Sequence, residues 1–125
     1  MTDAQSKTLL LVEDDRSARE VTALVLEAAG YRVICASNGS RALDILRTDA
    51  SIDLLLSDIH MPGGIDGIEL TQRARMTRQI RVMLLSGDPR SSFIDFPDNV
   101  IFLPKPYDRR SLLGAVDAVL QQSSS

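Results

Sequence analysis

The chain has 125 residues, a net charge of −3 and a hydrophobic content of 44%. This length suits one domain with a sizeable core, and the acidic balance argues against the basic surface that DNA or RNA binding requires. A single cysteine, Cys35, excludes an internal disulfide and suits a reducing compartment. The chain shows neither a signal-peptide pattern nor an apolar run long enough to cross a bilayer, so we expect a cytoplasmic protein that does not bind membranes.

Five short apolar runs, each bounded by polar or turn residues, predict five β-strands. The runs cover residues 7–12, 31–36, 52–56, 80–85 and 100–103. Segments with helical spacing of apolar residues lie between them, and the expected helix-start residues are Asp15, Asn38, Asp66 with Glu69 as a capping box, and Asp108. Strands that alternate with helices predict an α/β fold with a parallel sheet covered on both faces.

Three other parts of the chain carry simpler expectations. Gly30 should end the first helix, and Cys35 should be a small buried hydrophobe on the second strand. The first six residues and the segment from Gln121 onward read as polar tails.

The segment between the fourth and fifth strands does not read as a regular helix. Pro97 lacks the N–H that a continuing helix needs, and Pro89 biases the preceding residue away from helical angles. We therefore expect a fourth helix that is short or irregular. Among Phe93, Ile94 and Phe96, at least one side chain should be anchored in the core and another exposed.

The third apolar run is followed directly by Asp58, at the strand end where ligands collect in parallel sheets. Glu13 and Asp14 follow the first strand, Ser86 ends the fourth and Lys105 follows the fifth. Three crowded carboxylates repel one another unless a cation neutralises them, and Mg²⁺ prefers such oxygen ligands. An aspartate can accept a phosphoryl group, which requires metal and positive charge more than acid–base groups.

The order of these motifs resembles the receiver domain of bacterial two-component response regulators. The matching motifs are Glu13-Asp14, Asp58 with Met61-Pro62 and Asp66-Gly67, Ser86-Gly87, and Lys105-Pro106. The resemblance implies a flavodoxin-like (βα)5 fold, a doubly wound parallel five-stranded sheet, in a single receiver domain over residues 1–125 with a core at about 7–120.

The resemblance also implies how the site works. A sensor histidine kinase or a histidine phosphotransfer protein would phosphorylate Asp58. Mg²⁺ would be held by Asp14, Asp58 and the backbone carbonyl of His60, with Glu13 acting through water. Lys105 would pair with the phosphoryl group.

Further roles follow from the same resemblance. Ser86 and Phe102 would form a switch pair, and the Lys105-Pro106 peptide bond would be cis. The protein would not be an enzyme, since it would promote only its own phosphotransfer and dephosphorylation. His60 and Asp88 each stand two residues beyond a site residue, so we expect them to tune the lifetime of the phosphorylated form.

Three departures from the family pattern bear on output. The loop from Met61 to Gly67 is one residue longer than the usual form and resembles that of hybrid-kinase receivers. No effector domain follows, so we expect action through a downstream protein target instead of direct transcriptional control. Because the fourth helix is reduced, a homodimer would use the first or the last helix.

Two other functions stay open on the sequence. A small phosphatase of the haloacid-dehalogenase type also uses a strand-end aspartate, but its motif needs an acid where His60 stands. A phosphorylation-independent interaction module would keep the fold, although the presence of the whole site argues against it. Labelling by a small phosphodonor distinguishes the three functions.

Overall fold

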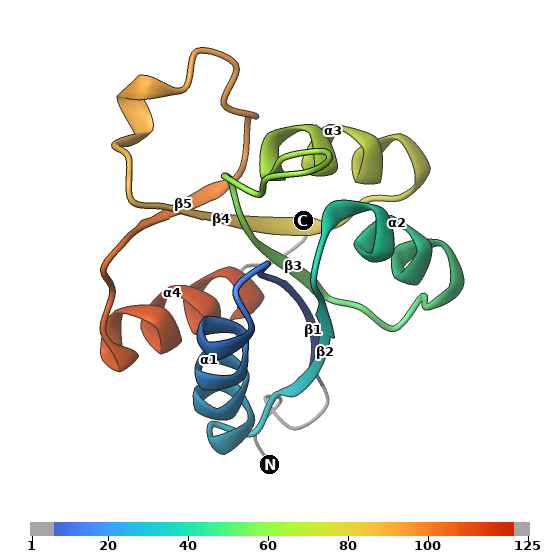
Figure 1. Ribbon diagram of the computed structural model, residues 1–125. Helices are drawn as coiled ribbons and strands as arrows, with labels where there is room; N and C mark the ends of the chain where they lie inside the picture. Colours follow the sequence, from blue (N-terminus) through green and yellow to red (C-terminus); the bar gives the residue numbers. More distant parts are fainter. Residues whose placement is uncertain (1–6, 122–125) are drawn as a thin grey trace.

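The computed structural model describes residues 7–121 (Figure 1). The predicted polar tails, residues 1–6 and 122–125, lie outside the described residues, whereas Gln121 belongs to the last helix. Among residues 7–121, no helix is both long and apolar enough to cross a membrane.

Five parallel strands form one sheet in the order β2-β1-β3-β4-β5. The strands are β1 (Thr8–Val12), β2 (Arg32–Ala36), β3 (Leu54–Asp58), β4 (Arg81–Ser86) and β5 (Ile101–Pro104). Each predicted strand is present with its ends shifted by at most two residues. The predicted flavodoxin-like parallel sheet is therefore confirmed.

Helices cover both faces of this sheet and bury its central strands. Helices α1 (Arg16–Ala28) and α4 (Arg109–Gln121) lie on one face, and α2 (Gly39–Thr48) and α3 (Gly67–Thr77) lie on the other (Figure 1). Leu54 and Leu56 of β3 join the apolar cluster under α1 and α4, while Leu55 joins the cluster under α2 and α3. Because β3 is covered on both faces, its first three residues are all leucine and do not alternate with polar residues.

Each helix starts at a predicted cap residue. The side chains of Asp15, Asn38, Asp66 and Asp108 accept hydrogen bonds from the backbone N–H groups of Ala18, Arg41, Glu69 and Ser111, at 2.7–2.8 Å. The predicted capping box is only half formed, because the Glu69 carboxylate pairs with Arg73 one turn later at 2.6 Å. Gly30 follows α1 with a φ of 101°, a conformation that favours glycine.

The segment between β4 and β5 confirms the prediction of a reduced fourth helix. Within the described residues it contains only one short 3₁₀ turn, η2 (Arg90–Ser92). Phe93 and Phe96 pack against the core while Ile94 is fully exposed. The Phe96 ring packs edge to face on Phe102, with 5.8 Å between the ring centroids. Aromatic side chains of this segment, and not a regular helix, therefore cover this part of the sheet.

The prediction that Cys35 is buried was wrong. The residue lies on β2, which is at the edge of the sheet and has β1 as its partner, and its side chain is exposed. An edge strand receives less cover from the helices than a central one, so an apolar-looking run there does not imply burial.

Arg78, which ends α3, binds the connection that leads from α2 into β3. Its guanidinium donates hydrogen bonds to four backbone carbonyl oxygens, those of Leu46 at 3.4 Å, Asp49 at 2.9 Å, Ala50 at 3.2 Å and Ile52 at 2.9 Å. These carbonyls include ones at the end of α2, where the helix dipole favours a positive charge. One side chain thus provides hydrogen-bond donors for four backbone carbonyls of a connection that has little secondary structure of its own.

We predict that Arg78→Ala lowers the free energy of unfolding by about 2 kcal/mol, because hydrogen bonds from a charged donor are lost and half-buried carbonyls are left without partners. Urea unfolding measures the change. Arg73→Ala is the matched control, since it removes an exposed i,i+4 pair and should cost less than about 0.5 kcal/mol. Equal losses for the two variants would contradict this role of Arg78.

Candidate functional site

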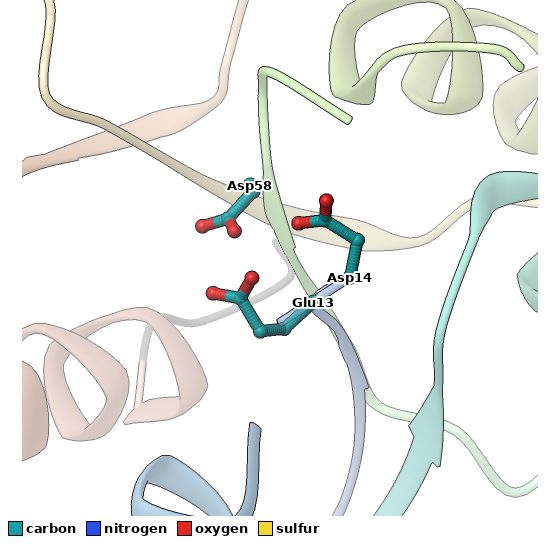
Figure 2. A group of neighbouring side chains, drawn as sticks. All are labelled: Glu13, Asp14 and Asp58. Atoms are coloured by element: carbon teal, nitrogen blue, oxygen red, sulfur yellow. The ribbon is translucent and has the colours of Figure 1, made fainter. Parts of the chain in front are cut away.

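The carboxyl ends of the strands gather the polar residues at one edge of the sheet. Glu13 and Asp14 lie just beyond β1, Asp58 is the last residue of β3, Ser86 ends β4 and Lys105 follows β5. Figure 2 shows the three acidic side chains pointing toward a common space. The structure therefore brings together residues that are far apart in the sequence, at the edge where parallel sheets bind ligands.

The three carboxylates form a close cluster. Glu13, Asp14 and Asp58 each offer an oxygen atom, and these atoms lie within 4.8 Å of one another. Asp58 and Glu13 are buried, with exposed fractions of 4% and 7%, whereas Asp14 is exposed. The cluster is thus a largely buried acidic site that opens to solvent beside Asp14.

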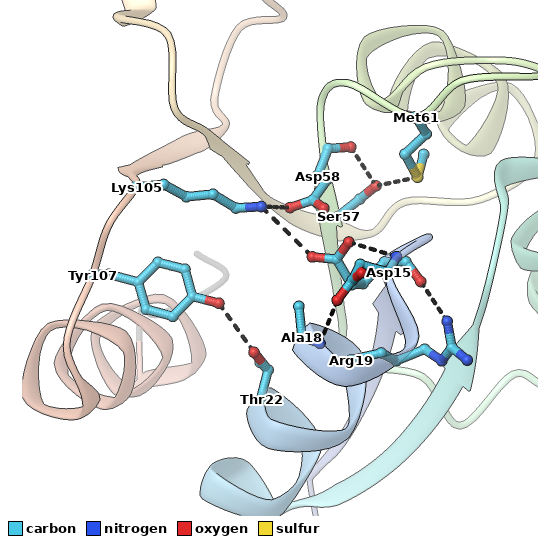
Figure 3. A network of polar contacts seen from close by, with 10 residues as sticks. Asp15, Ala18, Arg19, Thr22, Ser57, Asp58, Met61, Lys105 and Tyr107 are labelled. Atoms are coloured by element: carbon cyan, nitrogen blue, oxygen red, sulfur yellow. Dashed lines mark hydrogen bonds and ion pairs between the residues drawn. The ribbon is translucent and has the colours of Figure 1, made fainter.

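Lys105 is the cation that faces these acids. Its Nζ atom lies 2.7 Å from Oδ1 of Asp58 and 3.6 Å from Oε1 of Glu13 (Figure 3). Asp58 Oδ1 is fully buried, and the Lys105 ammonium is its one close partner among the described residues. One ammonium group thus faces three carboxylates, and the site is short of positive charge.

The pKa values reflect this imbalance. Burial raises the pKa of Glu13, and the neighbouring Asp58 carboxylate raises it further. For Lys105, burial alone would lower the pKa, but the hydrogen bond and charge of Asp58, together with the charge of Glu13, raise it above its usual value. Lys105 therefore stays protonated at neutral pH. A cation bound beside Glu13 would stabilise the ionised form of its carboxylate.

The residues present fit a divalent cation such as Mg²⁺. The cluster offers hard oxygen ligands, its negative charge is only partly neutralised, and the buried Asp58 Oδ1 has only the Lys105 ammonium beside it. The Glu13 side chain is held in place because the Asp15 N–H donates to its Oε2 at 3.0 Å, while Arg19 donates to its backbone carbonyl at 2.8 Å.

Gly67 explains how closely α3 approaches the end of β3. A Cβ at this position would lie 2.3 Å from the carbonyl oxygen of Asp58, which no other residue type could tolerate without moving the backbone. The Gly67 N–H donates to the carbonyl of Ile59 at 2.8 Å. In the same loop, Ile65 packs on Gly39 at the start of α2, where a Cβ would lie 2.4 Å from it.

The sequence did not predict that His60 and Asp88 contact each other. His60 Nε2 lies 2.8 Å from Asp88 Oδ2, and the imidazole ring lies 5.5 Å from the Phe93 ring. Both side chains are more than half exposed. Their only sequence signal was that each stands two residues beyond a strand end, so the bridge between the two loops is a finding of the structure.

Ser86 and Phe102 lie where the sequence placed them but already have local partners. The Ser86 side chain is buried, and its Oγ accepts a hydrogen bond from the N–H of Asp88 at 2.9 Å. Phe102 is half-buried against Phe96. The expected cis bond between Lys105 and Pro106 is present.

Tyr107 was missed by the sequence reasoning. Its hydroxyl lies 3.1 Å from Oγ1 of Thr22 on α1, so this hydrogen bond joins the segment after Lys105 to that helix (Figure 3). The two residues are 85 positions apart, and neither shows a pattern that would pair them.

Comparisons with known proteins agree with this geometry. The family model described as the response regulator receiver domain matches residues 9–117. The transcriptional regulatory protein CpxR of Escherichia coli (strain K12) is 38% identical over 120 residues, which are 92% of this chain and 50% of CpxR, so the chain spans about half the length of such curated relatives. The response regulator receiver protein CpdR of Brucella abortus (strain 2308) is 36% identical over 121 residues, covering 91% of this chain and 97% of CpdR.

A solved structure leads to the same assignment. The receiver domain of the hybrid histidine kinase CckA is 40% identical, with a TM-score of 0.78 and coverage of 91% of this chain and 99% of that one. Sequence, fold and the strand-end cluster agree. The chain belongs to the response regulator receiver domain family and has the phosphoacceptor signalling role of that family.

Proposed function

We propose that Asp58 is the phosphoacceptor and that residues from about 7 to 120 act as one receiver domain. The observation that carries this proposal is the buried Asp58 carboxylate at the end of β3, paired with Lys105 and flanked by Glu13 and Asp14. It is the one carboxylate of the cluster that a strand holds rigidly. A sensor histidine kinase or a histidine phosphotransfer protein would be the phosphodonor.

The chemistry follows from the charges at the site. A bond would form between an Asp58 carboxylate oxygen and phosphorus while the N–P bond of the donor histidine breaks, and the histidine nitrogen would keep the electron pair and gain a proton from solvent. The Lys105 ammonium, which lies 2.7 Å from Asp58, would then move onto the oxygens of the bound phosphoryl group. Asp14, Asp58 and the backbone carbonyl of His60 would hold Mg²⁺, with Glu13 acting through water. The ion supplies positive charge to the phosphoryl oxygens.

Ser86 and Phe102 are proposed as the switch pair. In the structure, Ser86 Oγ accepts a hydrogen bond from the N–H of Asp88 at 2.9 Å. To donate to a phosphoryl oxygen, the Ser86 hydroxyl would have to turn toward Asp58. Movement of Ser86 therefore disturbs the start of the β4–β5 segment. Phe102 contacts the same segment through Phe96, so both switch residues act on one surface.

The wider role is that of a phosphorelay receiver that is not an enzyme in its own right. We propose that it works in the cytoplasm, acts on a downstream protein target and does not bind DNA directly. A homodimer would use α1, whose Val21 and Leu24 are exposed, or α4. The haloacid-dehalogenase alternative is not favoured, because the family is shown and His60 stands where that chemistry needs an acid.

We predict that Asp58→Asn abolishes stable labelling by acetyl phosphate in the presence of Mg²⁺, measured by intact mass. Asp14→Asn should weaken Mg²⁺ binding at least tenfold, because a charged ligand is lost. Asp15→Asn is the matched control: Asp15 lies in the same turn but caps α1, and should label as wild type. Normal labelling of Asp58→Asn would refute the proposal, and rapid phosphoester turnover would favour a phosphatase.

Mg²⁺ should raise the melting temperature of the wild type, because an ion that binds only the folded state stabilises it. In metal-free buffer, Asp58→Ala should melt above wild type, since it removes a buried carboxylate that repels Glu13. Mg²⁺ should then stabilise the variant less. Differential scanning fluorimetry with and without chelator measures both effects, and a clearly lower metal-free melting temperature for Asp58→Ala would count against this balance of charges.

His60→Ala and Asp88→Ala should change the dephosphorylation rate in the same direction and by a similar factor. Each substitution removes the same bridge between the two loops that follow Asp58 and Ser86, and we propose that this bridge borders the path of a hydrolytic water. The double variant should add little to either single change, as for two residues that act through one contact. Decay of the labelled protein gives the rates, and unchanged rates for both single variants would dispose of this role.

A further inference from the structure

One hydrogen bond joins the two parts of the chain that carry the opposite charges of the site. The Tyr107 hydroxyl lies 3.1 Å from Oγ1 of Thr22, and the two residues are 85 positions apart (Figure 3). Tyr107 stands two residues after Lys105, the cation of the site. Thr22 lies on α1, the helix that follows the acidic turn of Glu13 and Asp14. The bond therefore fixes the segment of the cation against the helix that follows the acids.

On the side of α1, Thr22 has a fixed position relative to Glu13. The Asp15 side chain accepts a hydrogen bond from the Ala18 N–H at 2.8 Å, and the Asp15 N–H donates to the Glu13 carboxylate at 3.0 Å. Thr22 follows Ala18 by four residues and lies on the same face of the helix. It is buried, with an exposed fraction of 7%. The acidic turn, the helix cap and Thr22 thus form one rigid unit.

On the other side, few soft dihedral angles separate Lys105 from Tyr107. Proline rings fix φ at positions 104 and 106, and the second proline also restricts the backbone of Lys105. The Lys105 N–H donates to the Ser86 carbonyl at 2.8 Å, which holds this backbone to the end of β4. The position of the Tyr107 ring therefore constrains the direction in which the Lys105 side chain leaves the backbone.

The Lys105 side chain gains from such a constraint because it is long and partly open to solvent. Its exposed fraction is 35%, and its Nζ atom lies 2.7 Å from Asp58 and 3.6 Å from Glu13. A flexible four-carbon chain loses rotamer freedom when its charge is held in one place. If the fold supplies part of this order beforehand, the reaction step needs to supply less of it.

We infer that Tyr107 and Thr22 are a positioning pair that holds the Lys105 ammonium beside Asp58 and so speeds phosphoryl transfer. The inference rests on the proposed function. With acetyl phosphate as donor, a bond forms between an Asp58 oxygen and phosphorus, the bond from phosphorus to the acetate oxygen breaks, and acetate leaves with the electron pair. From its held position the ammonium reaches the phosphoryl oxygens during this step. The pair acts through Lys105 and not on the reacting atoms themselves.

The first test measures the rate of labelling by acetyl phosphate in Mg²⁺ buffer, with intact mass as the readout. Tyr107→Phe and Thr22→Val each remove one hydroxyl and keep the shape of the side chain, so each should lower the rate about threefold to tenfold. The double variant should fall no further, as for two residues that act through one contact. Thr22→Ser keeps the hydroxyl and should label within about twofold of wild type.

Tyr31→Phe is the matched control. The Tyr31 side chain belongs to the apolar cluster under α1 and α4, and its hydroxyl donates to the Asp117 carboxylate on α4. Tyr31 precedes β2, so it lies at the end of the sheet opposite to the site. The substitution removes a tyrosine hydroxyl bond between distant parts of the chain. The melting temperature should fall, and the labelling rate should stay at the wild-type value.

The second test follows Lys105 itself and needs no phosphorylation. The chain has two lysines, Lys7 and Lys105, so peptide mass spectrometry after brief treatment with an amine-acetylating reagent follows both. In Tyr107→Phe and Thr22→Val, the modification rate of Lys105 should rise about threefold or more, because its ammonium is held less firmly against the carboxylates. Lys7 is the internal reference and should keep its rate. Thr22→Ser and Tyr31→Phe should leave both rates unchanged.

The outcomes separate the two proposals. Unchanged labelling in both Tyr107→Phe and Thr22→Val overturns the positioning pair while the phosphoacceptor function stands. Slower labelling with unchanged modification of Lys105 overturns it as well, and so does an equal loss of labelling in Tyr31→Phe. If the wild type does not label, the proposed function fails and the effect on transfer fails with it, whereas the modification rates still decide whether the pair holds the ammonium.

Discussion

The structure depends on the balance between one ammonium group and three carboxylates at the edge of the sheet. Lys105 lies 2.7 Å from Asp58 and 3.6 Å from Glu13, and the cluster still carries more negative than positive charge. Such a site is stable only if rigid elements hold the charges against their repulsion. The buried strand β3 holds Asp58, and the cap of α1 holds the turn that carries Glu13. The proposed binding of a cation and of a phosphoryl group would offset this remaining imbalance.

Much of the fold and of this cluster could be predicted because parallel sheets obey a simple rule. Residues that follow alternating apolar runs must meet at one edge, whatever their separation in the chain. Asp58 and Lys105 were found in this way, and they form the closest ion pair of the cluster. The cap residues of the helices were predictable for a similar reason, since an aspartate or asparagine before an apolar periodic segment satisfies local N–H groups. Both signals are local or depend only on strand order.

Contacts between distant side chains could not be predicted. Periodicity tells which face of a helix is buried, but not which residue lies opposite, so the pairing of Thr22 with Tyr107 and of His60 with Asp88 had no sequence signal. The same holds for Arg78, whose guanidinium binds four carbonyls that lie 26 to 32 positions away in the chain. The prediction that Cys35 is buried was wrong for another reason. An apolar pattern does not reveal whether a strand is central or at the edge of the sheet.

The reduced fourth helix changes how the site connects to the surface. A regular helix would satisfy its own backbone and could keep its shape while the site changes. The β4–β5 segment has only one 3₁₀ turn, so its position depends on contacts with site residues: Asp88 with Ser86 and His60, Phe93 with His60, and Phe96 with Phe102. Rotation of the Ser86 or Phe102 side chain would therefore remove contacts that hold the β4–β5 segment in position. Under the proposed switch, the surface around the fully exposed Ile94 would be the part of the described chain that changes first.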